Sequence, residues 1–167
     1  MDKFTEIKEE ILRRAKNAEA CVGQYKRALE SQTLQELAQV IKDNFTWCCN
    51  GKVLDVEIVE RYETEFATVE IYANKSISNG YVVIDGKVEK LSGNAVACMY
   101  GNSTVTKMCD NSTVTNMLDN STVTNMWNNA YISTYGYIEC KINDNAIMRV
   151  RSENKIYTNT TVEKPKL

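Results

Sequence analysis

The chain has 167 residues and no histidine, and this absence excludes several kinds of active site at once. Sites in which a histidine activates a serine or a cysteine are ruled out, and the commonest metal ligand is missing. The seven glycines form no phosphate-binding loop. Long apolar runs are also absent, so the sequence predicts a cytoplasmic protein that makes no membrane contact.

Neither sign of charge dominates, because 20 basic residues face 22 acidic ones and the net charge is -2. This balance argues against direct nucleic-acid binding, which requires a strongly basic surface. Hydrophobic residues make up 43% of the chain, which is enough for a packed core. The six cysteines show no zinc-finger or CxxC spacing, so we expect reduced, packed thiols and neither a metal nor a cofactor.

The first part of the chain, residues 1–67, has helical patterning. Apolar side chains recur at three and four residues from Phe4 through Ile7 and Ile11. Thr33 followed by Glu36 predicts one helix start, and Asp55 predicts another. The sequence therefore predicts a helical N-terminal region that contains several short amphipathic helices.

Acidic side chains cluster near the end of this region and in the segment after it. Residues 51–92 hold eight acidic and five basic side chains. Three of the carboxylates, Glu57, Glu60 and Glu63, are candidates for binding a basic groove on another protein. From 68 to 92 the residues become β-branched and aromatic, which predicts a strand-rich connector or cap.

From residue 93 onward the sequence repeats with a period of nine. The clearest copies are NSTVTKMCD at 102–110, NSTVTNMLD at 111–119 and NSTVTNMWN at 120–128. A branched residue occurs five times at this spacing, at Val96, Val105, Val114, Val123 and Ile132. After a loss of three residues near Gly136, the series is predicted to resume at Ile138, Ile147 and Ile156.

A nine-residue period does not fit a helix of 3.6 residues per turn, and threonine, valine and asparagine favour strands and turns. Each unit is therefore predicted to be a strand followed by a turn, with two units per coil of 18 residues. Coils would rise about 4.8 Å each, the spacing of neighbouring strands. This arrangement predicts two buried stacks, one of Val96, Val114 and Ile132 and one of Val105 and Val123, with methionines filling the space between the walls. It also predicts outward rows of threonine hydroxyls. Asparagine ladders are expected at the turns, Asn102 with Asn120 and Asn111 with Asn129.

The predicted fold class is α+β, a helical N-terminal region followed by a short parallel β-solenoid, which is a β-helix or β-roll of nine-residue repeats. The three predicted segments are the helical region 1–67, the connector 68–92 and the solenoid with its C-terminal tail, 93–167. The repeats lack the glycine pairs and the carboxylates of a calcium-binding roll.

The repeat run NSTVTKMCDNSTVTNMLDNSTVTNMWN resembles the repeats of small proteins from phages and mobile elements of gut bacteria, which read N-A-T-V-x-A-x-D/G. The opening KFTEIKEEILRRAKNAEACVGQYKRA and the segment LQELAQVIKDNFTWCC resemble the N-terminal half of the same proteins. The departures lie in the repeats, where methionine and the second threonine replace the usual residues. The resemblance implies origin and architecture, since these proteins have no settled activity. Small phage proteins in general often inhibit host defence, including CRISPR nucleases, which predicts an anti-CRISPR-like inhibitor.

The sequence therefore predicts a non-enzymatic protein that binds a host or defence protein, for example a CRISPR nuclease. Trp127 is a candidate anchor at one end of the repeats, because tryptophan is enriched at binding hot spots. Arg149 and Arg151 are further candidates, in a basic stretch with Lys155, Lys164 and Lys166. Two alternatives stay open: a structural solenoid segment of a virion, and a small carboxylate-based enzyme. A homo-oligomer is also compatible with the sequence.

Overall fold

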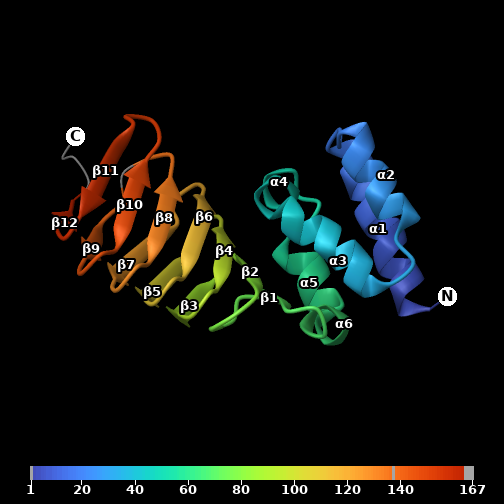
Figure 1. The fold of residues 1–167 in the computed structure, drawn as a ribbon, viewed down its shortest axis with the longest axis horizontal. Coiled ribbons are helices and arrows are strands. Elements are labelled where there is room, and N and C mark those ends of the chain that lie inside the picture. Colours follow the sequence, from blue (N-terminus) through green and yellow to red (C-terminus); the bar gives the residue numbers. More distant parts are fainter. Residues whose placement is uncertain (1, 137, 164–167) are drawn as a thin grey trace. The chain divides into compact units, whose positions relative to one another are not determined.

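The computed structural model describes residues 2–136 and 138–163, in two compact units that comprise Met1–Ala73 and Asn74–Leu167. Figure 1 shows helices in the first unit and a stack of strands in the second, which confirms the predicted fold class. The elements of the first unit are α1 (Lys3–Asn17), α2 (Val22–Glu30), α3 (Leu34–Asp43), α4 (Phe45–Asn50), α5 (Val56–Arg61), α6 (Glu63–Ala67) and β1 (Ile71–Ala73).

The helix starts of the first unit are made by the polar residues that the sequence indicates. The Thr33 hydroxyl accepts the backbone N–H of Glu36 at 3.2 Å, and the Asp55 carboxylate accepts that of Ile58 at 3.0 Å. Each bond satisfies a donor that would otherwise lack a partner in the first helical turn. The apolar stripes of these helices meet in a common core, whose fully buried members include Ile7, Leu37, Ile41, Ile58 and Phe66.

Arg14 connects the first helix of this unit to the fifth. Its Nε donates to Glu10 at 2.7 Å, and its Nη1 donates to Asp55 at 2.7 Å and to the carbonyl oxygen of Lys52 at 3.2 Å. The guanidinium is mostly buried. Arg14 therefore bridges segments about forty residues apart in the sequence.

Acidification is expected to weaken the first unit through Glu10. Hydrogen bonds from Arg13 and then Arg14 lower the pKa of Glu10 from 4.5 to about 2. A carboxylate whose pKa is depressed stabilises the fold above its unfolded pKa, and this contribution is lost as the pH falls through the folded pKa. Between pH 4.5 and 2 we expect Glu10 to account for a loss of about 1–2 kcal/mol in the free energy of unfolding.

Urea unfolding followed by helical circular dichroism at several pH values measures this contribution. Glu10→Gln should flatten the pH dependence, whereas Glu9→Gln, at an exposed neighbouring position, should leave it as in the wild type. Equal pH dependence in the two variants would contradict the role assigned to Glu10.

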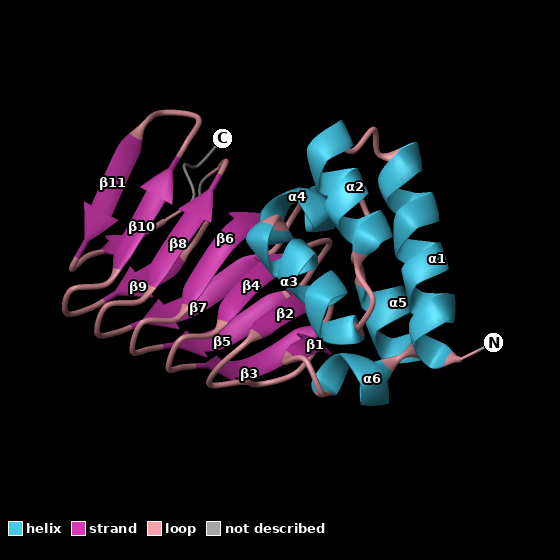
Figure 2. Ribbon diagram, turned by 45° about the vertical axis from the view of Figure 1, so that its right-hand side comes forward, coloured by secondary structure: helices cyan, strands magenta, loops and turns pink. Residues whose placement is uncertain are grey.

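The second unit is a β-solenoid with two facing sheets, which Figure 2 shows as successive layers of strands. In one sheet β2, β4, β6, β8 and β10 are parallel neighbours, and in the other β3, β5, β7 and β9 are. The strands are β2 (Tyr81–Ile84), β3 (Lys87–Leu91), β4 (Val96–Met99), β5 (Thr104–Met108), β6 (Thr113–Met117), β7 (Thr122–Met126), β8 (Tyr131–Thr134), β9 (Cys140–Ile142), β10 (Ile147–Val150), β11 (Lys155–Thr158) and β12 (Thr161–Val162). The last two are antiparallel, β11 beside β10 and β12 beside β9.

The pairing register confirms a coil of two nine-residue units. Val105 lies beside Val123, and Val114 lies beside Ile132, each pair 18 residues apart. These four side chains are fully buried. The repeat methionines are buried as well, so they fill the interior between the two sheets as predicted.

Hydrogen-bonded asparagines follow the turns of the solenoid from one coil to the next. The side-chain amide of Asn120 donates to Asn102 at 3.3 Å, and that of Asn129 donates to Asn111 at 3.2 Å. Both predicted ladders are therefore confirmed. The Oγ1 atoms of Thr104 and Thr122 lie 3.2 Å apart, so a threonine row is confirmed on β5 and β7.

The backbone conformation at the last position of the repeat explains why glycine, aspartate or asparagine occurs there. Asp110, Asp119 and Asn128 have positive φ angles of 61°, 58° and 56°, a conformation that these residue types tolerate best. The Asp110 carboxylate accepts the N–H of Gly93 at 2.9 Å, and the Asp119 carboxylate accepts that of Gly101 at 3.0 Å. Each turn is thus tied to the equivalent turn of the preceding coil.

The solenoid begins before the first recognisable repeat. Strand β2 pairs in register with β4, and β3 pairs with β5, so residues 81–91 form a first coil. Its valines and leucine lack the NSTVT signature, which hides this coil from a search for the repeat. The predicted boundary at Gly93 falls inside the continuous stack of strands.

The predicted inner positions are wrong for three residues, Val96, Ile147 and Ile156. Ala97, and not Val96, lies beside Val114, because the register shifts between Ala97 and Cys98. After the shortened turn, Met148 lies beside Ile132 and takes the inner place expected for Ile147. Ile147 and Ile156 are instead 36% and 65% exposed. The shift and the shorter turn change the phase, which simple counting by nine does not reveal.

Candidate functional site

The interior of the solenoid is filled by side chains. The inner positions of its strands, including Ala97, Met108, Val123 and Met148, have no exposed surface. A ligand would therefore meet this unit on its outside.

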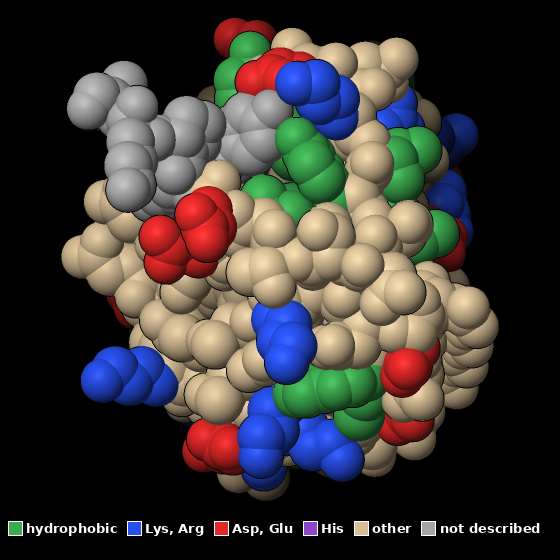
Figure 3. All heavy atoms as spheres, turned by 90° about the vertical axis from the view of Figure 1, so that its left-hand side faces the viewer, with side chains coloured by type: hydrophobic (Ala, Val, Ile, Leu, Met, Phe, Trp, Pro, Cys, Tyr) green, Lys and Arg blue, Asp and Glu red, His purple; other side chains and the backbone are tan. Residues whose placement is uncertain are grey.

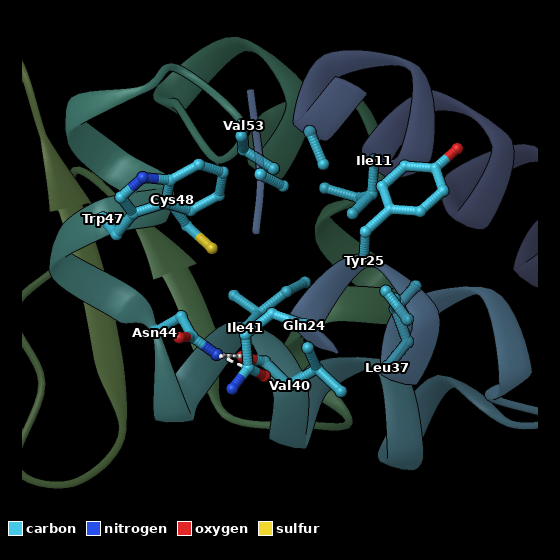
Figure 4. A pocket seen from close by; sticks show the side chains of 13 residues that line it. Ile11, Gln24, Tyr25, Leu37, Val40, Ile41, Asn44, Trp47, Cys48 and Val53 are labelled. Carbon is cyan, nitrogen blue, oxygen red and sulfur yellow. Dashed lines mark hydrogen bonds between the residues drawn. The ribbon is translucent and has the colours of Figure 1, made fainter. Parts of the chain in front are cut away.

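A small cavity lies inside the helical unit. Figure 4 shows it between Ile11 of α1, Tyr25 of α2 and the Trp47–Cys48 side of α4. Its volume is about 30 Å³, and its walls are mainly apolar. Asn44 lies at one side and donates to Gln24 at 3.2 Å and to the Val40 carbonyl at 2.8 Å. This space is at least tenfold smaller than a site for a small molecule.

An exposed set of mixed side chains lies on the outer face of β8 and β10. Tyr131 pairs with Ile147, and Ser133 pairs with Arg149, so the four residues occupy neighbouring places on one face. Ile147 is 36% exposed, Arg149 is exposed, and Tyr131 and Ser133 are half-buried. We call these four residues the outer patch.

Arg149 supplies the charge of the outer patch. Its Nη2 donates to the side-chain oxygen of Asn154 at 3.3 Å, which is a neutral partner. The Asn154 side chain does not offset the positive charge of the guanidinium, which lies on the same face as Ile147 and Tyr131. Tyrosine and arginine are the residue types that, with tryptophan, dominate binding hot spots.

Arg151 has a different environment from Arg149. Its Nη2 donates to Oδ1 of Asn116 at 2.5 Å, which connects the turn after β10 to β6, two strands away. Since Asn116 is itself buried, Arg151 has a structural partner.

A surface hollow of about 310 Å³ lies near the ends of β6 and β8 and is lined partly by Met117, Leu118 and Tyr135.

Trp127 lies in the turn after β7 and is half-buried. Its backbone N–H donates to the Met108 carbonyl at 3.0 Å, which fixes the turn against the preceding coil. It belongs to the other sheet from Arg149 and Arg151, so the sequence-predicted residues of this unit do not form one cluster. Lys155 forms an ion pair with Glu153 at 2.6 Å, and Lys164 and Lys166 lie outside the described residues.

The acidic candidates belong to the helical unit and are all exposed. Glu57 and Glu60 lie on α5, and Glu63 begins α6. Glu57 forms an ion pair with Arg61 one turn later. This pair reduces the net negative charge around the three glutamates, because the Arg61 cation offsets the Glu57 carboxylate.

Thiol chemistry is suppressed at the two cysteines with shifted pKa values. Burial raises the pKa of Cys140 to about 12. Burial, and then the nearby Asp110 carboxylate, raises the pKa of Cys109. Both remain thiols at neutral pH, which makes them poor nucleophiles. Within residues 2–136 and 138–163, no three His, Cys, Asp or Glu side chains gather in a way that could hold a metal ion.

Sequence reasoning found Arg149 but missed Tyr131, Ser133 and Ile147 of the outer patch. The strand alternation around Ile132 could have placed Tyr131 and Ser133 on the outside. The sequence places Ile147 inside, which is wrong because the segment between β8 and β9 is two residues short and not three.

Comparison with protein-family models, curated proteins and solved structures finds no match to this chain. None of the helices in the described part of the chain is both long and apolar enough to span a bilayer.

Proposed function

We propose that this chain is a non-enzymatic binding protein that attaches to another protein through the outer patch. The observation that carries the proposal is the register of β8 and β10, which places Tyr131 beside Ile147 and Ser133 beside Arg149 on one exposed face. A face of this kind offers aromatic, aliphatic and cationic contacts in a small area.

The scaffold beneath the patch supports this function. The side chains below it, Ile132 and Met148, are fully buried, and the strands are hydrogen-bonded on both sides of β8 and β10. A surface fixed in this way loses little conformational entropy when a partner binds. The proposal also requires no reactive group.

The partner class follows from the sequence resemblance. Small proteins of phages and mobile elements are a source of inhibitors, so a host or defence protein, such as a CRISPR nuclease, is the proposed target. The chain would inhibit by occupying a surface that the target needs. Glu57, Glu60 and Glu63 and, separately, Trp127 are competing surfaces for the same function.

Affinity capture from bacterial cells that carry defence nucleases tests the proposal. The wild type is compared with three variants. The outer-patch variant combines Tyr131→Ala, Ile147→Asp and Arg149→Glu. The acidic variant changes Glu57, Glu60 and Glu63 to Lys, and the third variant is Trp127→Ala. We expect a protein that the wild type enriches to be lost, by at least about tenfold, only with the outer-patch variant. Enrichment by all four proteins would contradict the assignment, and enrichment by none, the wild type included, would contradict the function.

A further inference from the structure

The sheet that carries the outer patch ends in an exposed strand. β11 pairs with β10 in antiparallel register and is the last strand of its sheet. In the part of the chain that the structure describes, no strand lies on its other side. Such an edge offers backbone donors and acceptors to another strand.

The central side chain of this edge is apolar. Ile156 is 65% exposed and lies directly beside Arg149, on the same face as Ile147. Proteins commonly protect an edge strand by keeping it short or by placing charged residues, lysine above all, proline or a bulge on it. Strand β11 is short and begins with Lys155, but its exposed Ile156 offers an apolar contact. The surface at this end of the solenoid, seen in Figure 3, shows hydrophobic side chains in separate patches among polar atoms.

We propose that β11 pairs edge to edge with β11 of a second copy of this chain. The two strands run antiparallel, and Ile156 packs against Ile156 of the second copy. This inference is independent of the function proposed above, because it uses the edge of the sheet and not the outer patch.

The charges on and beside the strand favour this register. With Ile156 opposite itself, Lys155 lies opposite Tyr157 of the second copy, and Asn154 lies opposite Thr158. A shift by two residues would place Lys155 opposite Lys155, and like charges in directly opposed positions are destabilising. The two Arg149 side chains are three strand steps apart, about 14 Å, which exceeds the screening length at physiological salt.

The expected dimer is weak. Strand β11 contributes four residues, so the interface is smaller than that of a stable dimer. Association should therefore depend on protein concentration and reverse on dilution. A second copy fits this edge because it brings an equally exposed Ile156 to the contact and, in this register, places no lysine opposite another lysine.

Sedimentation velocity of the full chain, from micromolar to millimolar concentration, tests for this dimer. The wild type should shift from monomer to dimer, and Ile156→Asp should weaken association by at least about tenfold. Val22→Asp is the matched control, because Val22 is an aliphatic residue that is 85% exposed on α2 of the other unit. A wild type that stays monomeric, or Val22→Asp acting like Ile156→Asp, would overturn the proposal.

Disulfide trapping tests the register. In a Cys21→Ser background, which removes an exposed thiol, Ile156→Cys should form a symmetric disulfide-linked dimer, because opposed Cα atoms lie about 4.5–5.5 Å apart. Lys155→Cys should form several-fold less, since its two copies are offset along the strands. Equal trapping at both positions would overturn the proposed register, and so would trapping in the background protein alone. Binding of an added β11 peptide without any dimer would show that the edge serves a different partner.

Discussion

Val114→Asp is expected to destabilise the solenoid by more than about 4 kcal/mol, which is much of the stability of a small domain. Val114 has no exposed surface, and its neighbours across the strands are Ala97 and Ile132, which are also fully buried. An aspartate there would place a carboxylate between two coils without a hydrogen-bond donor from these side chains. Chemical denaturation followed by β-sheet circular dichroism measures the effect.

Thr124→Asp is the control for this change. Thr124 lies on β7, in the nine-residue unit that follows the unit of Val114, and its side chain is exposed. The free energy of unfolding should change by no more than about 0.5 kcal/mol. Equal destabilisation by the two aspartates would mean that the inner and outer faces have been assigned incorrectly.

Phe66→Ala is expected to have the largest effect in the helical unit, about 3–5 kcal/mol. Phe66 lies on α6, is fully buried and is the largest of the fully buried side chains. Its removal leaves a cavity among packed neighbours, which adds to the lost transfer free energy. Hydrogen exchange should show lower protection of amides in residues 2–73 first.

Leu29→Ala provides the comparison for Phe66→Ala. Leu29 lies on α2 and is 52% exposed, so its truncation should cost less than about 1 kcal/mol. Similar losses of protection in the two variants would indicate that the helical unit is not organised around the core that contains Phe66.

The main features of the solenoid could be predicted because its repeat is nearly perfect. Val105, Val114 and Val123 recur every nine residues and the asparagines mark each turn, so strand, turn and coil length follow from the pattern. The helix starts at Thr33 and Asp55 could be predicted for a similar reason, since side-chain capping is local chemistry.

The ends of the solenoid could not be predicted from the period. A bulge at Ala97 and a shortened turn after Thr134 change which residues face inward, and these depend on packing between coils. The outer patch spans that turn, with Tyr131 and Ser133 before it and Ile147 and Arg149 after it. Its residues come together through strand register, and this coil has 16 residues in place of 18, so it has lost two residues and not the three that the sequence predicts.

The binding account is tested most directly by the affinity of the outer-patch variant for a purified partner. Isothermal titration calorimetry with the captured protein should give at least about a tenfold weaker Kd for Tyr131→Ala with Ile147→Asp and Arg149→Glu. Thr104→Asp with Thr124→Asp, on the other sheet, should bind like the wild type. Unchanged affinity of a folded outer-patch variant, or an equal loss with the threonine variant, would contradict the account.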